Sequence, residues 1–281
     1  MTAPLLVVDG DSFAHRAFHA LPKSIRRAGG KGAGAIVGFM NLLLRLYETE
    51  RPRAVLVGWD TLDAPTYRHL AFAPYQSGRE FDPELVEQLA VLPDMVAACG
   101  FIAAKAPGYE ADDFLAAATA QEEARGGTVL LASGDRDAFQ LASAATTILH
   151  PVKAGEMARI GPAEVMARYG VEPQQVPDFI ALRGDPSDKL PGAPGVGAKT
   201  AAAMLRKYGS LEALLAAGRF AEQAEALGLY RRIATMDCGA PVPLIGDQAP
   251  TWGQVAALAR SWELNRLADR LAAMNTTKTL S

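Results

Sequence analysis

The chain has 281 residues, of which 49% are hydrophobic and 21% charged, a composition typical of a globular protein with one large or two smaller domains. No stretch approaches the roughly 18 apolar residues of a membrane span, which excludes a membrane-spanning protein. The formal net charge of −3 argues against a nucleic-acid partner unless the acidic residues cluster around metal ions.

The first residues, MTAPLLVVDGDSF, lack a basic segment and reach an aspartate at position 9. We therefore expect a strand here rather than a signal peptide. The two cysteines, Cys99 and Cys238, lie far apart in the chain, and we expect both to be reduced residues of the core. These features predict a cytoplasmic protein.

Strand and helix patterns alternate in the first part of the chain. Three short apolar runs predict strands that are buried on both faces of a parallel sheet, at residues 4–8, 54–59 and 128–132. Three helical patterns alternate with them, at residues 34–50, 83–99 and 111–125. This alternation is typical of an α/β fold.

From about residue 161 the strand patterns mostly disappear, and helical segments follow one another with Gly or Pro at most of their borders. We therefore predict an α/β domain over residues 1–170 and a helical domain over residues 171–281. Trp252 and Trp262, near the end of the second domain, are expected to lie in its core.

Acidic residues follow all three predicted strands, at Asp9, Asp60, Asp135 and Asp137. Because ligands bind outside the carboxyl ends of the strands in open parallel sheets, these side chains should share one edge of the sheet. A further segment, GYEADDF, places three more acidic residues at the start of a predicted helix.

Each acidic segment alone has a simpler explanation, since carboxylates favour the first turn of a helix and aspartate is common in turns. As a set, they favour a site for divalent metal ions, which prefer oxygen ligands and need several converging carboxylates in two-metal phosphodiester chemistry. Other chemistries lack their motifs. The four histidines have no zinc spacing, no G-x-S-x-G occurs, and GAPGVGAKT has Ala198 before Lys199 where a nucleotide-binding loop has glycine.

Six motifs follow one another along nearly the whole chain: VVDGDSFAHRAFHA, VGWD, YRHLAFAPYQSGR, GYEADDFLA, SGDRDAFQL and DFIALRGDPSDKLPGAPGVGAKTA. In this order they resemble the 5′ nuclease (flap endonuclease) superfamily, whose bacterial members occur at the N-terminus of DNA polymerase I and as free-standing enzymes. The resemblance implies a PIN- or resolvase-like parallel-sheet nuclease core. It also implies a helical, SAM-like C-terminal part with a helix-hairpin-helix at about residues 184–207.

The resemblance implies two or more Mg²⁺ or Mn²⁺ ions, which in the family bind the scissile phosphate, activate a water and stabilise the leaving 3′ oxygen. The residues that match the first metal site are Asp9, Asp60, Glu110, Asp112 and Asp135. Those that match the second are Asp137, Asp185 and Asp188, and Asp113 matches an acidic position beside the first. Setting these nine aside from the 31 acidic residues leaves 22 against 28 basic ones, a balance that suits a polyanionic substrate.

By the same resemblance, residues 61–82 form the arch, or helical gateway, which threads or clamps a 5′ single strand. The side chains expected to stack on bases there are Tyr67, Phe72 and Tyr75, and those expected to meet phosphates and assist catalysis are Arg68 and Arg79. The hairpin is expected to bind a duplex phosphate, and in the family often a K⁺-like ion, at Gly195, Gly197, Lys199 and Thr200. Further DNA contacts are expected from Arg16 and Lys31.

The chain departs from the family at Gln76, where the family has a lysine thought to stabilise charge on the transferring phosphate. Glutamine donates a hydrogen bond without positive charge. Either Arg79, Arg68 or Arg16 compensates for the lysine, or the enzyme is slow, and we expect reduced but real activity.

The leading interpretation is a monomeric, metal-dependent 5′→3′ exonuclease and 5′-flap endonuclease in replication and repair. Its expected substrate is DNA with a 5′ flap, overhang or nick, including RNA-primed strands. One alternative is a PIN-type ribonuclease, which is disfavoured because PIN domains are shorter. The other is a branched-DNA binding protein with weak or lost catalysis, supported only by Gln76.

Overall fold

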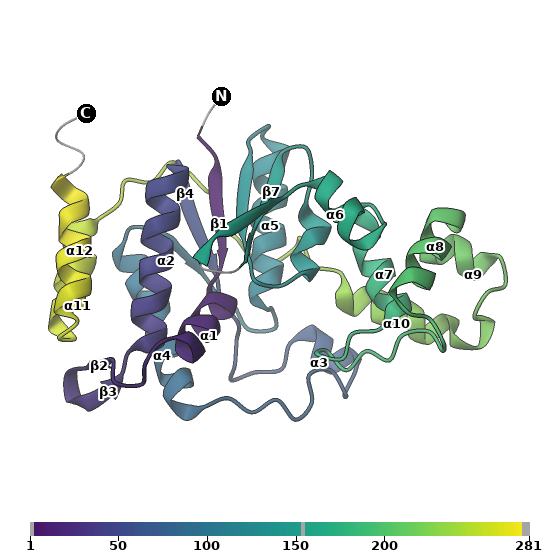
Figure 1. Ribbon diagram of the computed structural model, residues 1–281, viewed down its shortest axis with the longest axis horizontal. Helices are drawn as coiled ribbons and strands as arrows, with labels where there is room; N and C mark the ends of the chain where they lie inside the picture. Colours follow the sequence, from purple (N-terminus) through teal and green to yellow (C-terminus); the bar gives the residue numbers. More distant parts are fainter. Residues whose placement is uncertain (1–2, 153–154, 277–281) are drawn as a thin grey trace.

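The computed structural model describes residues 3–152 and 155–276. Residues 1–2, 153–154 and 277–281 of the two predicted domains lie outside the described ranges. In the described part, a central sheet has six strands in the order β5-β4-β1-β6-β7-β8 (Figure 1). The strands are β1 (Leu5–Asp9), β4 (Ala54–Gly58), β5 (Ile102–Ala104), β6 (Val129–Ala132), β7 (Thr146–Pro151) and β8 (Met157–Ile160). All neighbours pair in parallel except β8, which is antiparallel to β7. The predicted parallel sheet is confirmed.

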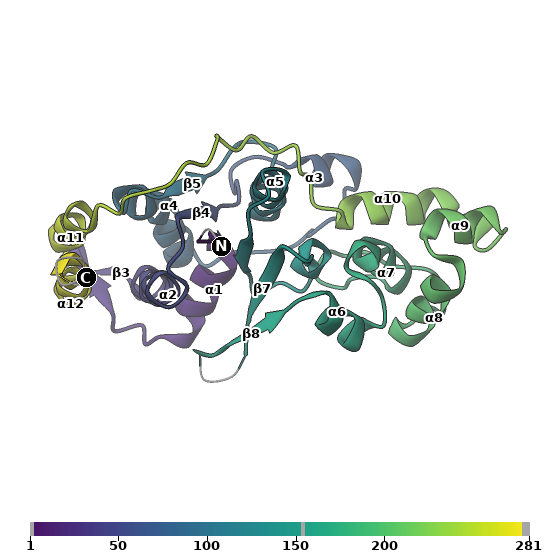
Figure 2. The same cartoon turned by 90° about the horizontal axis from the view of Figure 1, so that it is seen from above.

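Helices cover both faces of this sheet because its central strands are apolar on both sides. Leu5 and Val7 pack into the core on the side of α5, whereas Leu6 and Val8 pack into the core on the side of α2 and α4. Figure 2 shows α2 and α5 on opposite sides of the sheet. The helices of this domain are α1 (Gly10–Ala20), α2 (Gly34–Glu50), α3 (Tyr67–Ala71), α4 (Pro83–Ala98) and α5 (Ala111–Ala124). A two-stranded hairpin, β2 (Arg26–Arg27) and β3 (Lys31–Gly32), lies between α1 and α2 in the chain.

The helical part that the sequence predicts after residue 161 is confirmed. Its elements are α6 (Pro162–Tyr169), α7 (Val176–Arg183), α8 (Ala198–Tyr208), α9 (Leu211–Ala216) and α10 (Ala224–Ala234). Short 3₁₀ helices lie at Ala28–Gly30, Asp137–Leu141, Pro173–Gln175 and Ala221–Gln223. No helix among the described residues has both the length and the apolar character that crossing a bilayer requires.

The last two helices do not join this helical part, which corrects the prediction of one helical domain over residues 171–281. After α10, a segment without helix or strand leads back to α11 (Trp252–Ser261) and α12 (Asn265–Thr276), which lie beside α2 and far from α8 and α9 (Figure 1). Trp252 is 3% exposed and its ring contacts those of Tyr47 and Phe101, so the predicted core position of Trp252 is confirmed, but in the core of the α/β domain. Trp262, which is half-buried, packs beside the same core.

The two cysteines differ in their surroundings. Cys99 is a buried member of the core, as expected, whereas Cys238 is exposed, which corrects its prediction as a core residue. Neither forms a disulfide.

Candidate active site

A cleft of about 850 Å³ lies at the carboxyl ends of the parallel strands. Eight of the nine predicted metal ligands line it: Asp9, Asp60, Glu110, Asp112, Asp135, Asp137, Asp185 and Asp188. They come from the ends of strands, the start of α5 and the loop after α7, so residues far apart in the sequence and from both predicted domains meet in one place. The structure thus brings together the acidic residues that the sequence singled out.

Asp9 is the last residue of β1 and the N-cap of α1, and two serines hold its carboxylate. Asp9 Oδ1 accepts a hydrogen bond from the Ser12 amide at 3.0 Å, and Asp9 Oδ2 accepts one from Ser133 Oγ at 2.7 Å. Burial, with a smaller contribution from the nearby carboxylates of Asp60 and Asp135, raises the pKa of Asp9 to about 7. Cations in the cleft would relieve this desolvation and repulsion.

Asp60 is held by hydrogen bonds on both sides. Its Oδ1 accepts from the Ala111 amide at 2.7 Å, and its own amide donates to Asp11 Oδ2 at 2.7 Å. Asp11 is buried and lines the same cleft. Its pKa lies well above the ordinary value, mainly because the side chain is buried and, to a smaller extent, because the charge of Asp60 is near. Sequence reasoning missed Asp11, although it is the second acid of the DGD triplet that follows the first strand.

Further acids of the cleft come from the segment after β6 and from the loop after α7. The Asp137 amide donates to Asp135 Oδ1 at 2.9 Å. Asp185 begins a tight turn, in which its backbone exchanges two hydrogen bonds with Leu190 and its Oδ1 accepts from the Ser187 amide. This turn holds Asp188 at the cleft, where burial raises its pKa to about 6.

The donor set fits hydrated divalent cations. All eight candidate ligands are carboxylates, whose oxygens suit hard divalent cations. Among the described residues, no three acidic, histidine or cysteine side chains are grouped closely enough to hold one ion by themselves.

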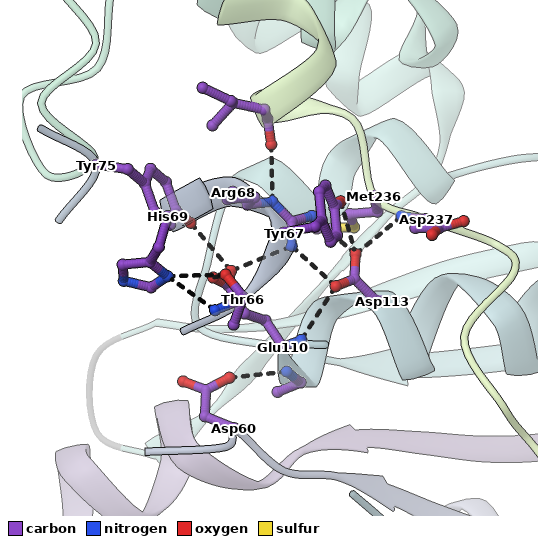
Figure 3. A network of polar contacts seen from close by, with 12 residues as sticks. Asp60, Thr66, Tyr67, Arg68, His69, Tyr75, Glu110, Asp113, Met236 and Asp237 are labelled. Carbon is purple, nitrogen blue, oxygen red and sulfur yellow. Dashed lines mark hydrogen bonds and ion pairs between the residues drawn. The ribbon is translucent and has the colours of Figure 1, made fainter. Parts of the chain in front are cut away.

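Asp113, the ninth predicted ligand, has a different partner (Figure 3). It is 0% exposed, and its two oxygens accept from the two terminal nitrogens of Arg68, each at 2.8 Å. Asp113 Oδ1 also accepts from the Asp237 amide. Because both oxygens are buried and occupied, the prediction of Asp113 as a metal ligand is wrong.

Arg68 is correspondingly unavailable to a substrate. Its side chain is 3% exposed, its Nε donates to the Ile233 carbonyl at 2.9 Å, and its Nη1 also donates to Glu110 Oε2 at 3.2 Å (Figure 3). The prediction that Arg68 meets a phosphate is therefore wrong. Arg68 instead ties α3 to the start of α5 and to the end of α10.

The aromatic residues predicted to stack on bases are also engaged within the protein. Tyr75 is buried and its Oη donates to Glu110 Oε2 at 3.0 Å, while Phe72 packs edge-on against Tyr230. Tyr67 donates to Asp113 and to the Thr235 carbonyl. The burial of Tyr75 corrects the stacking prediction for that ring, whereas stacking by Tyr67 and Phe72, which are half-buried, stays a prediction. Thr66, which the sequence did not single out, donates to Glu110 Oε1 at 2.8 Å.

Several residues of the predicted arch line the cleft, among them two polar side chains that contact each other. Gln76 and Arg79 both line it, and Arg79 is exposed with its Nη1 donating to Gln76 Oε1 at 2.8 Å. Arg16 is exposed on α1. Lys31, on the hairpin of β2 and β3, forms an ion pair with Glu87 of α4. Neither Arg16 nor Lys31 is among the residues that line the cleft.

The predicted phosphate site lies at the N-terminus of α8. Gly195, Gly197, Lys199 and Thr200 are all exposed there. Gly197 is the N-cap of α8, no side chain caps this end, and a methyl group at Gly195 or Gly197 would meet no atom within 4 Å. The amides of this helix end therefore face open space, as phosphate binding requires.

Comparisons with known proteins agree with this arrangement. Residues 4–170 match the family model described as 5′-3′ exonuclease, N-terminal resolvase-like domain, and residues 171–255 match the model described as 5′-3′ exonuclease, C-terminal SAM fold. The chain is 42% identical over 214 residues to DNA polymerase I of Mycobacterium tuberculosis, which covers 75% of this chain and 24% of the relative. It is 42% identical over 212 residues to the thermostable DNA polymerase I of Thermus aquaticus, covering 75% of this chain and 25% of the relative. The chain thus spans about a quarter of the length of these curated relatives.

Solved structures share the fold across nearly the whole chain. The T5 D15 protein co-crystallized with metal ions aligns with a TM-score of 0.67 at 16% identity, covering 96% of this chain and 98% of that one. The catalytic core of Rad2 in complex with DNA substrate aligns with a TM-score of 0.62 at 11% identity, covering 96% and 91%. At these identities the likeness concerns the fold.

Proposed function

The chain belongs to the 5′-3′ exonuclease family, and on this basis we propose that it is a 5′→3′ exonuclease and 5′-flap endonuclease that hydrolyses DNA phosphodiester bonds with two or more Mg²⁺ or Mn²⁺ ions. The observation that carries the proposal is the cleft in which eight carboxylates from both halves of the chain converge. Such a cluster repels itself unless cations occupy it, and two-metal hydrolysis is the chemistry that uses this arrangement.

The family resemblance divides the carboxylates into two groups, one for each metal site that we propose. The first holds Asp9, Asp60, Glu110, Asp112 and Asp135, and the second holds Asp137, Asp185 and Asp188. Bound ions would neutralise these carboxylates and polarise the phosphodiester that is hydrolysed. The chain's own task is to fix the ligands, as Ser12 and Ser133 do for Asp9.

The substrate we propose is a duplex with a 5′ flap, overhang or nick, including an RNA-primed 5′ strand. The exposed amides at the start of α8, with Lys199, would anchor a phosphate of the duplex and hold a K⁺-like ion, while the cleft receives the 5′ end. Arg79, which lines the cleft, would face that strand. The enzyme we propose acts as a monomer in the bacterial cytoplasm, in replication and repair.

A gel assay with a 5′-labelled flap duplex tests the proposal. With Mg²⁺ or Mn²⁺, short 5′ products should appear. With EDTA, or with Asp9→Asn in Mg²⁺, the duplex should be bound but remain whole. Cleavage that persists in EDTA, or in Asp9→Asn, would contradict the proposal.

The second candidate function is a branched-DNA binding protein with weak or lost catalysis, which the uncharged Gln76 favours. In the same assay it would shift the flap duplex and leave it uncut with either metal. Cleavage of single-stranded RNA in preference to DNA would instead indicate a ribonuclease.

A further inference from the structure

Gln76 is the meeting point of three side chains in the cleft. Its Nε2 donates to Asp188 Oδ1 at 3.0 Å and to Tyr75 Oη at 2.9 Å, and its Oε1 accepts from Arg79 Nη1 at 2.8 Å. The partners fix the orientation of the amide, because a flipped amide would set two acceptors against each other at Asp188 and two donors against each other at Arg79.

Through these bonds Gln76 joins the two groups of carboxylates. Asp188 belongs to the second group. Tyr75 passes the chain of bonds to the first group, since its Oη accepts from Gln76 and donates to Glu110 Oε2 at 3.0 Å. One neutral side chain thus connects Glu110, at the start of α5, with Asp188, in the turn after α7.

The same amide sets the place of Arg79. Three arginines could compensate for the positive charge of the family's lysine. Of these, Arg68 is buried in its pair with Asp113, and Arg16 does not line the cleft. Arg79 is exposed in the cleft, and its guanidinium is bonded to the Gln76 amide oxygen. Four further donor hydrogens of that guanidinium are then available to a substrate.

The backbone at Gln76 is itself unusual. Its φ is 48°, in the left-handed region that non-glycine residues seldom adopt, and Gly78 in the same turn has φ 76°. Such a conformation is kept where surrounding contacts outweigh its cost. Here the three side-chain hydrogen bonds of Gln76 are the contacts that do so.

We propose that Gln76 is a positioning residue that holds Arg79 over the cleft and, at the same time, fixes Asp188 and, through Tyr75, Glu110 in the spacing that the metal ions need. This inference rests on the proposed nuclease function. It departs from the expectation that glutamine at this position is only a lost charge: the cation is supplied three residues later, by Arg79, and the glutamine orients it.

A double-mutant cycle tests the link between Gln76 and Arg79. Gln76→Met keeps the size of the side chain and removes its hydrogen bonds, and Arg79→Met removes the cation. In single-turnover cleavage of the flap duplex, Gln76→Met should lower the rate by about 10-fold or more and Arg79→Met by about 100-fold. At saturating Mn²⁺, where weaker metal binding no longer limits the rate, Gln76 acts on cleavage through Arg79, and the double variant should cleave within about threefold of Arg79→Met. Effects that simply multiply would overturn the proposal.

The second part of the proposal, that Gln76 positions the metal ligands, is tested without DNA. The protein is titrated with Mn²⁺ while its unfolding temperature is followed. Gln76→Met should need about 10-fold more Mn²⁺ than the wild type for half of the stabilisation. Gln76→Glu keeps an acceptor for Arg79 but cannot donate to Asp188, so it should retain more of the Arg79-dependent rate than of the Mn²⁺ affinity. Unchanged Mn²⁺ affinity in both variants would overturn this half.

Ser77→Ala, at an exposed neighbouring position, is the matched control and should behave as the wild type in both assays. The outcomes separate the inference from the proposed function. A wild type that never cleaves with Mg²⁺ or Mn²⁺ contradicts the nuclease proposal, whereas a wild type that cleaves, with independent effects of Gln76 and Arg79, contradicts only the role of Gln76.

Discussion

Arg68 and Asp113 form a buried, two-bonded ion pair directly behind the acidic cleft, with both hydrogen bonds at 2.8 Å (Figure 3). Asp113 was a predicted metal ligand and Arg68 a predicted phosphate contact. As a pair they instead connect α3 with α5 and with the end of α10.

Breaking this pair should unfold the protein more easily. Arg68→Met or Asp113→Asn leaves an unbalanced buried partner, and we expect each to lower the free energy of unfolding by about 3–5 kcal/mol in urea. Arg68→Met combined with Asp113→Asn should be less destabilising than the sum of the two single changes. If Asp113→Asn lowered Mn²⁺ affinity with no loss of stability, Asp113 would be a metal ligand after all.

The metal-free protein should lose stability as the pH rises. Burial raises the pKa of Asp9 from 3.8 to about 7, so between these values the folded protein holds a proton that the unfolded chain has released. Stability contributed by this protonation is present at low pH and is lost as the pH rises toward about 7.

Thermal unfolding in EDTA at about pH 5 and about pH 8 measures this effect, and Asp9→Asn should reduce the difference. Adding Mg²⁺ at the higher pH should restore the unfolding temperature of the wild type, since it binds only the folded protein. A difference between the two pH values that is as large in Asp9→Asn as in the wild type would show that Asp9 is not its source.

The C-terminal helices should be needed for the stability of the α/β domain. Trp252 is 3% exposed between Tyr47 and Phe101, and Trp252→Ala should cost about 3–5 kcal/mol of unfolding free energy. Leu244→Ala in the same C-terminal region is the control, because Leu244 is 80% exposed and its loss should change stability by no more than about 0.5 kcal/mol. If Trp252→Ala and Leu244→Ala lowered the free energy of unfolding by equally small amounts, α11 would not pack against the core of the α/β domain.

The start of α8 should affect duplex binding and not folding. Gly197 has φ −93°, which other residues adopt, and a side chain there meets no protein atom, so Gly197→Val should fold normally. It should nevertheless weaken duplex binding in EDTA, because the side chain occupies the approach of a phosphate. Lys199→Ala should reduce the salt dependence of binding by about one charge. Unchanged affinity in both variants would exclude this helix end as an anchor.

The sequence predicts the fold and the acidic cleft well for a physical reason. Asp9, Asp60 and Asp135 each follow a strand of the same parallel sheet, and parallel strands bring their carboxyl ends to one edge. Strand β5 escaped prediction because it has only three residues, and β7 and β8 escaped it because they mix polar and apolar residues.

The sequence pattern does not show in which direction each side chain points or which distant residue it contacts. Asp112 and Asp113 are neighbours in a helix, where successive residues point about 100° apart. One therefore faces the cleft while the other faces Arg68. The partners of Gln76 are likewise invisible in sequence, because Asp188 lies 112 residues away. Trp252 was recognisable as a core residue, but which core it joins depends on long-range packing.

The central claim is that carboxylates from the two halves of the chain form one metal-dependent site. The most direct measurement is single-turnover cleavage of a 5′-flap duplex in Mg²⁺ by the wild type and by Asp185→Asn, whose carboxylate comes from the loop after α7. We predict that the variant binds the duplex as the wild type does and cleaves it at least about 100-fold more slowly. Cleavage by Asp185→Asn at the wild-type rate would contradict a site shared between the two halves.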